Sequence, residues 1–175
     1  MSDTPATPDN GSNNAAGAPA PNDAPSFTVL AQYLKDLSFE NPRAPAIFAN
    51  PPTPKMEVNV DVNGRGFGPD QYEVELTVSA KANADGEAMF IIEATYAGAF
   101  EIKNMVPEQL EGVMLVECPR LLFPFLRQVV ADATRNGNFP PLMLEPIDFM
   151  AIYVANKQQQ QAQAGGAPAP AGQNT

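Results

Sequence analysis

The chain of 175 residues contains no histidine and only one cysteine. The lack of histidine excludes histidine metal sites, Ser-His-Asp and Cys-His catalytic arrangements, and imidazole acid–base chemistry. A single cysteine, Cys118, permits no internal disulfide, which fits a reducing compartment, and by itself it cannot form a zinc cluster. Because Cys118 lies in an apolar segment, we expect a buried structural thiol rather than a nucleophile.

Long apolar runs are also missing. No stretch approaches the length of a transmembrane helix, and the N-terminus shows no basic region followed by an apolar run. The sequence therefore predicts neither a membrane span nor a signal peptide, and we expect a cytoplasmic protein that does not insert into the membrane.

Positive charge is scarce, and the formal net charge is −10. Three aspartates and one lysine lie in the terminal segments, so the central region carries −8. This excess of negative charge argues against nucleic acid and anionic lipid as partners and suits a basic partner. Ordinary solubility charge explains the same composition equally well.

The two ends differ in composition from the centre. Residues 1–26 are rich in Pro, Ala, Asn, Gly and Asp, and residues 157–175 consist mainly of Gln, Ala, Gly and Pro. Such segments bury too little apolar surface to offset chain entropy, so both are predicted to be disordered tails. One domain remains, over residues 27–156, which is large enough for a single core.

Four segments have the alternating pattern of β-strands, at residues 27–39, 55–64, 71–82 and 87–102. In the first, Phe27, Val29, Leu37 and Phe39 share one parity, and Lys35 is the polar exception. Five prolines between Pro42 and Pro54 forbid regular structure there. The run "GRGFGP" at 64–69 is predicted to be a flexible break, and "NADG" a hairpin turn.

After Pro107 the apolar period becomes helical. Leu121, Phe125 and Val129 recur at four-residue spacing, Pro124 should kink or loosen this helix, and "RNGN" ends it. A second helix is expected to start near Pro146. The predicted fold is therefore α+β, a four-stranded antiparallel sheet with two C-terminal helices packed on one face.

The expected sheet exceeds what its helices can cover. Strands of 11–13 residues span about 37–44 Å, whereas a 16-residue helix spans about 24 Å. The helix around Leu121 is also apolar on most of its circumference, although packing on a sheet needs only one stripe. We predict that Leu121, Phe125 and Val129 are buried against a neighbouring chain. A helix buried entirely within one monomer is the alternative.

Little in the sequence supports catalysis. The "GRGFG" run lacks the Lys-Ser/Thr of a phosphate-binding loop and precedes a strand, not a helix. Glu73 and Glu75 would lie about 7 Å apart on one strand face, a spacing that admits glycosidase-like chemistry, but a solvated acidic face is the simpler interpretation. We expect no enzymatic activity, no use of ATP, no cofactor and no metal site.

Several motifs together resemble the SecB family of bacterial protein-export chaperones. They are "YLKDLSFENPRAP" (33–45), "EVELTV" (73–78), "ECPRLLFPFLRQVV" (117–130), "GNFPPLMLEPIDF" (137–149) and the glutamines after the last helix. The resemblance implies a homotetramer built as a dimer of dimers, with helices sandwiched between sheets. It also implies that unfolded precursor proteins bind in long apolar grooves and are handed to SecA, the ATPase that drives the translocon.

The resemblance also implies site residues. The client-binding groove should comprise Met56, Val58, Val60, Phe149, Ile152 and Tyr153, with the "GRGFG" run as a flexible lip. The same side chains could instead be plain core. The SecA contact should comprise Asp36, Glu40, Ile91 and Glu93, which would meet a basic, zinc-holding tail of SecA. An ordinary solvated sheet face is the alternative there.

Two other classes of function stay open at this stage. One is a small-molecule-binding or enzymatic α+β domain with a closed apolar pocket, which the lack of a polar constellation disfavours. The other is an interaction module whose groove takes a single folded partner.

Overall fold

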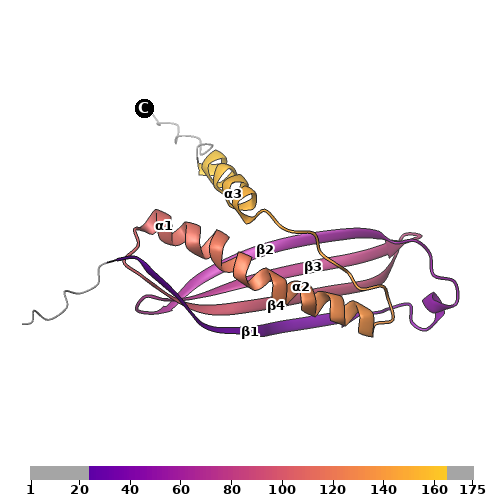
Figure 1. The fold of residues 1–175 in the computed structure, drawn as a ribbon. Coiled ribbons are helices and arrows are strands. Elements are labelled where there is room, and N and C mark those ends of the chain that lie inside the picture. Colours follow the sequence, from indigo (N-terminus) through magenta and orange to yellow (C-terminus); the bar gives the residue numbers. More distant parts are fainter. Residues whose placement is uncertain (1–23, 165–175) are drawn as a thin grey trace, which may run out of the picture.

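The computed structural model describes residues 24–164, and most of both predicted tails lies outside this range. Four strands come first, then a helical run and a last helix (Figure 1). The elements are β1 (Ser26–Glu40), η1 (Ala46–Phe48), β2 (Lys55–Gly68), β3 (Gln71–Ala84), β4 (Glu87–Lys103), α1 (Pro107–Gly112), η2 (Val113–Glu117), α2 (Cys118–Asn136) and α3 (Phe149–Ala164). Helix α3 runs to Ala164 and so continues past the predicted domain end at residue 156.

The strands form one antiparallel sheet in the order β1-β4-β3-β2. Strands β2, β3 and β4 follow one another through tight hairpins, and β1 lies beside β4, which is a Greek-key connection. The proline-rich segment 41–54, with the short helix η1, makes the long crossover from β1 to β2. Both β1 and β2 are therefore edge strands.

The predicted flexible break at residues 64–69 is wrong. β2 continues to Gly68, with Gly64 opposite Val74 and Arg65 opposite Glu73. Gly64 serves a close approach instead, because a Cβ at this position would lie 2.4 Å from Cε of Met114 on η2. The turn itself is shorter and places Asp70 in the left-handed region, with φ 53°.

β1 does not alternate simply along its length. Its pairing with β4 slips between Val29 and Ala31 and again between Leu34 and Asp36, as two β-bulges. Between the bulges the faces are exchanged, so Tyr33 lies opposite Ala97 and Leu34 opposite Tyr96. The single apolar face predicted for residues 27–39 is therefore interrupted in its middle.

One face of the sheet, called the inner face here, is covered by the helical run α1-η2-α2 (Figure 1). On α2 the residues Leu122, Leu126 and Val130, one turn apart, are fully buried against the strands. They meet the inner-face side chains Val74, Leu76, Val78, Ile92 and Phe100, which form the core. Helix α2 continues through Pro124 as one element.

The placement of the last helix differs from the prediction. A turn at residues 137–139 and a segment without regular structure, 140–148, separate it from α2, and α3 starts at Phe149 rather than near Pro146. It packs chiefly on η2 and projects away from the sheet instead of lying on its face (Figure 1). Within residues 24–164 no helix is both long and apolar enough to span a membrane.

Candidate functional site

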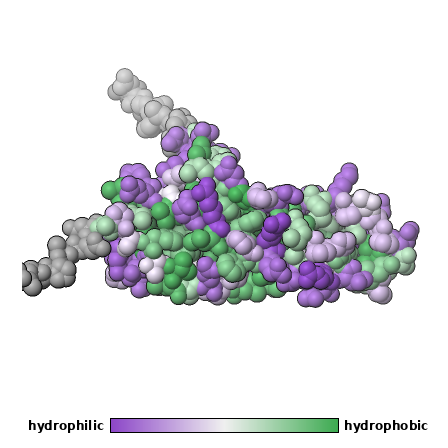
Figure 2. All heavy atoms as spheres, in the orientation of Figure 1, coloured by the Kyte–Doolittle hydropathy of each residue, from purple (hydrophilic) through white to green (hydrophobic). Residues whose placement is uncertain are grey.

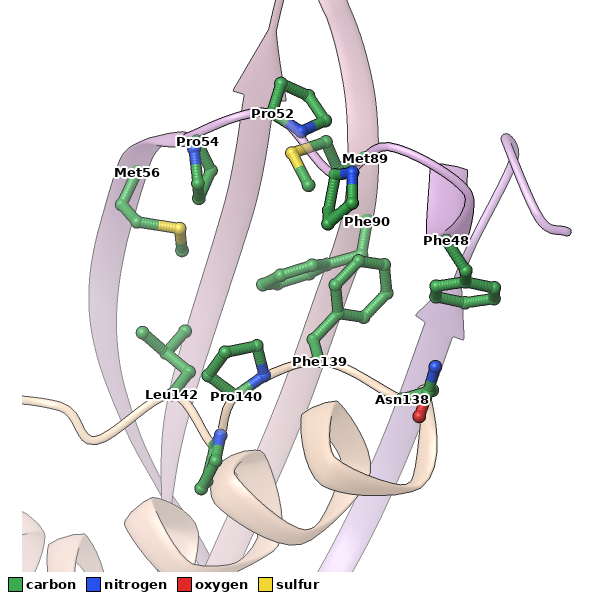
Figure 3. A pocket seen from close by; sticks show the side chains of 12 residues that line it. Phe48, Pro52, Pro54, Met56, Met89, Phe90, Asn138, Phe139, Pro140 and Leu142 are labelled. Carbon is green, nitrogen blue, oxygen red and sulfur yellow. The ribbon is translucent and has the colours of Figure 1, made fainter. Parts of the chain in front are cut away.

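A cavity of about 450 Å³ opens where the crossover enters β2 (Figure 3). Phe139 lies at its centre, with its ring centroid 4.9 Å from that of Phe90 and 5.7 Å from that of Phe48. The lining residues come from the crossover, from strands β2 and β4 and from the segment after α2. They are Phe48, Pro51, Pro52, Pro54, Met56, Met89, Phe90, Asn138, Phe139, Pro140, Pro141 and Leu142. Asn138 is the single amide or charged side chain among them.

The segment 137–148 continues this cavity along the edge strand. A second hollow of about 390 Å³ lies between Val58 and Val60 of β2 and residues 142–147. Leu142 lines both spaces, so they adjoin. Together the cavity and this second hollow are called the β2 groove. Val58 is 43% exposed and Met143 54%, so apolar side chains here face solvent.

The six predicted groove residues fall into three places. Met56, Val58 and Val60 lie in the β2 groove. Ile152 and Tyr153 line a separate, more polar hollow beside Asp61 and Glu111. Phe149 is 2% exposed and packs edge-on against Phe123, with ring centroids 6.1 Å apart, so it belongs to the core.

Sequence reasoning missed the aromatic part of the groove. Phe48 and Phe139 lie in proline-rich segments that have no helix or strand period, and those segments were interpreted as connections. The available signal was phenylalanine beside proline, in "AIFANPP" and "NFPP". Proline restricts φ and lacks a backbone N–H, so these segments form neither a strand nor a long helix. Phe48 projects from the short helix η1, and Phe139 from the connection after α2.

The predicted flexible lip lies far from the cavity. Phe67 of the "GRGFG" run is about 36 Å along β2 from Met56, at a strand rise of about 3.3 Å per residue. Phe67 is 54% exposed, and the run around it is paired strand.

A second apolar surface flanks α2 on the inner face. Leu121 and Phe125 are 42% and 49% exposed, and Phe125 stacks on Tyr96 of β4, with ring centroids 5.7 Å apart. Leu34 and Leu37 of β1 are also exposed on this face. Val129 is only half-buried and packs against the core. Figure 2 shows apolar residues gathered over the helical run and the strands beneath it.

The outer face, opposite the helices, carries the residues predicted to contact SecA. Glu40 lies opposite Ile91, and Ser38 lies opposite Glu93, so Asp36, Glu40, Ile91 and Glu93 share this face. Asp36, Glu40 and Glu93 are exposed, and none forms an ion pair with any described residue. These four residues are called the acidic patch.

A second group of carboxylates on the outer face, Glu73 and Glu75, forms ion pairs with cationic side chains. Glu73 is buried, which corrects the prediction of a solvated acidic face. It accepts hydrogen bonds from the Tyr33 hydroxyl, from Lys35 Nζ at 2.9 Å and from Arg65 Nε at 2.7 Å. Lys35 Nζ also donates to Glu75 Oε1 at 2.6 Å. The Tyr33 hydrogen bond, followed by those from Lys35 and Arg65, lowers the pKa of Glu73 to about 2.

This pKa predicts how stability depends on pH. Because the folded pKa of Glu73 lies below its ordinary 4.5, the carboxylate stabilises the fold above pH 4.5, and this contribution is lost as pH falls from 4.5 towards 2. The variant E73Q should therefore be less stable than the wild type at pH 7, by a margin that narrows at pH 3. Urea unfolding of both proteins at equal concentration, at pH 7 and at pH 3, measures the difference in their free energies of unfolding. A margin independent of pH would contradict the pKa.

Within residues 24–164 the cysteine and the acidic side chains are not arranged as a reactive thiol or a metal site. Cys118 is fully buried, and burial raises the pKa of its thiol to about 12, which disfavours the nucleophilic thiolate. No group of three or more Cys, Asp or Glu side chains in residues 24–164 is arranged to hold a metal ion.

Comparisons with known proteins agree on the family that this chain resembles. The family model for "Preprotein translocase subunit SecB" matches residues 20–161. A protein-export protein SecB of Xanthobacter autotrophicus is 51% identical over 145 residues, which cover 82% of this chain and 93% of the relative. One of Maricaulis maris is 48% identical over 167 residues, covering 95% and 92%.

Among solved structures, a SecB-like chaperone of Mycobacterium tuberculosis, in complex with a peptide from an antitoxin, has the same fold. The TM-score is 0.58 at 16% identity, over 69% of this chain and 90% of that one.

Proposed function

This chain belongs to the SecB family of protein-export chaperones, and we propose that it holds precursor proteins unfolded in the β2 groove and delivers them to SecA. In this proposal the protein works in the cytoplasm, needs no ATP and catalyses no reaction. Its contribution is to cover apolar segments of a client before the client folds or aggregates.

The observation that carries the proposal is the open, apolar β2 groove. An unfolded chain presents scattered apolar side chains, each worth about 1.5–3 kcal/mol when fully buried. The aromatic cavity beside Phe139 and the shallower hollow beside Val58 are two adjoining subsites for such side chains. Several weak subsites bind without requiring a particular sequence, and a client that occupies more than one gains affinity from the linkage.

A refolding experiment tests the chaperone activity. An exported precursor is diluted from urea with and without the protein and without ATP, and its folding and light scattering are followed. We expect the precursor to stay soluble and unfolded when the protein is present. Folding or aggregation at the unassisted rate would refute the proposal.

The proposed assembly is a homotetramer, a dimer of dimers. The exposed Leu121 and Phe125, beside the apolar inner face of β1, support it because a lone subunit leaves this area in water. The half-buried Val129 would extend the contact. Static light scattering should give about four chains per particle.

The acidic patch is the proposed contact for SecA. Its three carboxylates have no cationic partner in the described chain, in contrast to Glu73 and Glu75 on the same face. Free carboxylates of this kind suit a basic segment, and any zinc in the contact would belong to SecA. Such attraction weakens with added salt.

Reversing one charge in the acidic patch tests this contact. E93K should weaken SecA binding by about 10-fold or more, because it removes one attraction and adds a repulsion. Client binding should be unchanged, since the β2 groove is elsewhere. The matched control is E57K, the same charge reversal on the outer-face edge of β2, which should change SecA affinity by less than about 2-fold. Equal losses in both variants would argue for non-specific charge attraction.

A further inference from the structure

Two registers of β1 against β4 would place Phe27, Leu37 and Phe39 on the inner face, so these apolar residues alone do not choose between them. Without bulges, pairing from Phe27 opposite Ile102 would continue regularly and would bring Leu37 opposite Ile92 and Phe39 opposite Phe90. In the observed register the two bulges shift the later pairs by two residues, so Leu37 lies opposite Ala94 and Phe39 opposite Ile92. Both arrangements keep Phe27, Leu37 and Phe39 on the inner face.

Lys35 distinguishes the two registers. Without bulges it would point to the inner face opposite Ala94, among apolar side chains, where an unpaired ammonium group is strongly disfavoured. In the observed register it is the extra residue of the second bulge. Its ammonium then lies on the outer face, 2.9 Å from Glu73 Oε1 and 2.6 Å from Glu75 Oε1.

Strand β4, which lies between β1 and β3, permits the contact of Lys35 with Glu73 and Glu75. Glu73 and Glu75 belong to β3, two strands away from Lys35, and the β4 residues opposite them are Ala99 and Ala97. Because these side chains are single methyl groups, Lys35 and Tyr33 can lie across β4 and reach the carboxylates. The outer-face network therefore ties β1 to β3 in the bulged register only.

The register also sets the geometry of the acidic patch. In the observed pairing Glu40 lies beside Ile91, and Glu93 faces the neutral Ser38. Without bulges Asp36 would face Glu93 directly, and Glu40 would move opposite Met89. Two carboxylates would then meet at a cross-strand distance of about 5 Å, which is destabilising, and the patch would lose its spacing.

We infer that Lys35 is a positioning residue for the acidic patch: through Glu73 and Glu75 it holds β1 in the bulged register that spaces Asp36 and Glu40 against Ile91 and Glu93. Lys35 itself does not contact the partner. This inference rests on the proposed SecA contact. It gives the hydrogen bonds of the buried Glu73 a role in forming that contact.

The test compares K35M with K35R. Methionine keeps the length of the side chain without its charge, so it can occupy the inner face, whereas arginine keeps the contacts with both carboxylates. The register at the acidic patch is reported independently by the pair S38C/E93C, because residues 38 and 93 are opposite each other only with both bulges present, whereas without bulges residue 93 would lie opposite residue 36. Cys118 is buried and leaves the two introduced thiols as the accessible pair.

We expect the cysteine pair to crosslink with Lys35 present and with K35R, and to lose most of its crosslinking with K35M. The affinity for purified SecA should fall about 10-fold for K35M and change less than about 2-fold for K35R. Client binding should persist in both variants, as a check on the fold.

Normal crosslinking by K35M, with or without a loss of SecA affinity, would overturn the inference, because the register would then not depend on the charge. Failure of the pair to crosslink with Lys35 present would overturn it too. E93K distinguishes failure of this inference from failure of the proposed SecA contact. If E93K binds SecA normally, the acidic patch is not the SecA site. The crosslinking experiment still decides whether Lys35 sets the register.

Discussion

Replacing Phe48 with aspartate should weaken binding of an unfolded precursor by about 10- to 100-fold, which corresponds to about 1.5–3 kcal/mol for one buried apolar contact. Phe48 stands at the mouth of the cavity, 36% exposed, with its ring centroid 5.7 Å from that of Phe139. A carboxylate there removes an aromatic surface and adds a charge that an apolar client cannot solvate. Because Phe48 lies in the crossover outside the sheet, the fold should persist.

The measurement is the Kd of a fluorescently labelled, urea-unfolded precursor in a dilution series. F67D is the matched control: it removes an even more exposed aromatic side chain, 54% against 36%, at the far end of β2. Its affinity should stay within about 2-fold of the wild type. A loss in F67D as large as in F48D would mean that the cavity is not the principal client site.

A valine at Gly98 should destabilise the protein by about 3 kcal/mol, at the upper end of the usual range for an overpacked core. At Gly98 of β4 the side chain of Leu122 from α2 packs close to the strand. A Cβ at this position would lie 2.6 Å from the ring of Phe100 and 3.0 Å from Cδ2 of Leu122. Both neighbours are fully buried, so neither can move aside without displacing the helix from the sheet.

Urea unfolding followed by circular dichroism, at one fixed chain concentration, measures this change in stability. The control is G112V in the helical run, where a Cβ would meet no atom within 4 Å. We expect the stability of G112V to differ from the wild type by less than about 1 kcal/mol. A similarly small change for G98V would show that helix and strand are packed less tightly than these distances require.

The elements with a clear period were predictable from the sequence. Alternation in residues 71–82 and 87–102 corresponds to β3 and β4, and the four-residue spacing of apolar residues corresponds to α2. These segments are covered on one face by the core, so the pattern of burial and the pattern of the sequence coincide.

What the sequence did not reveal depends on contacts between distant segments. The bulges in β1 follow from the pairing of Lys35 with carboxylates two strands away, which no local pattern in β1 expresses. The glycines at 64–68 suggest a mobile loop in the sequence, because the role of Gly64 in admitting Met114 appears only when η2 packs over β2. The family resemblance implies Met56, Val58 and Val60 of β2, which line the β2 groove, but it does not point to the aromatic cavity that the two proline-rich segments form together.

Five of the twelve residues around that cavity are prolines, and proline has no backbone N–H to offer. A guest chain lying against these prolines finds few backbone donors for its own carbonyl groups, so this part of the wall does not pair with it as a β-strand. Under the proposed function the guest is held here mainly through its side chains. Its release from the prolines then breaks apolar contacts one at a time and requires no row of backbone hydrogen bonds to open together.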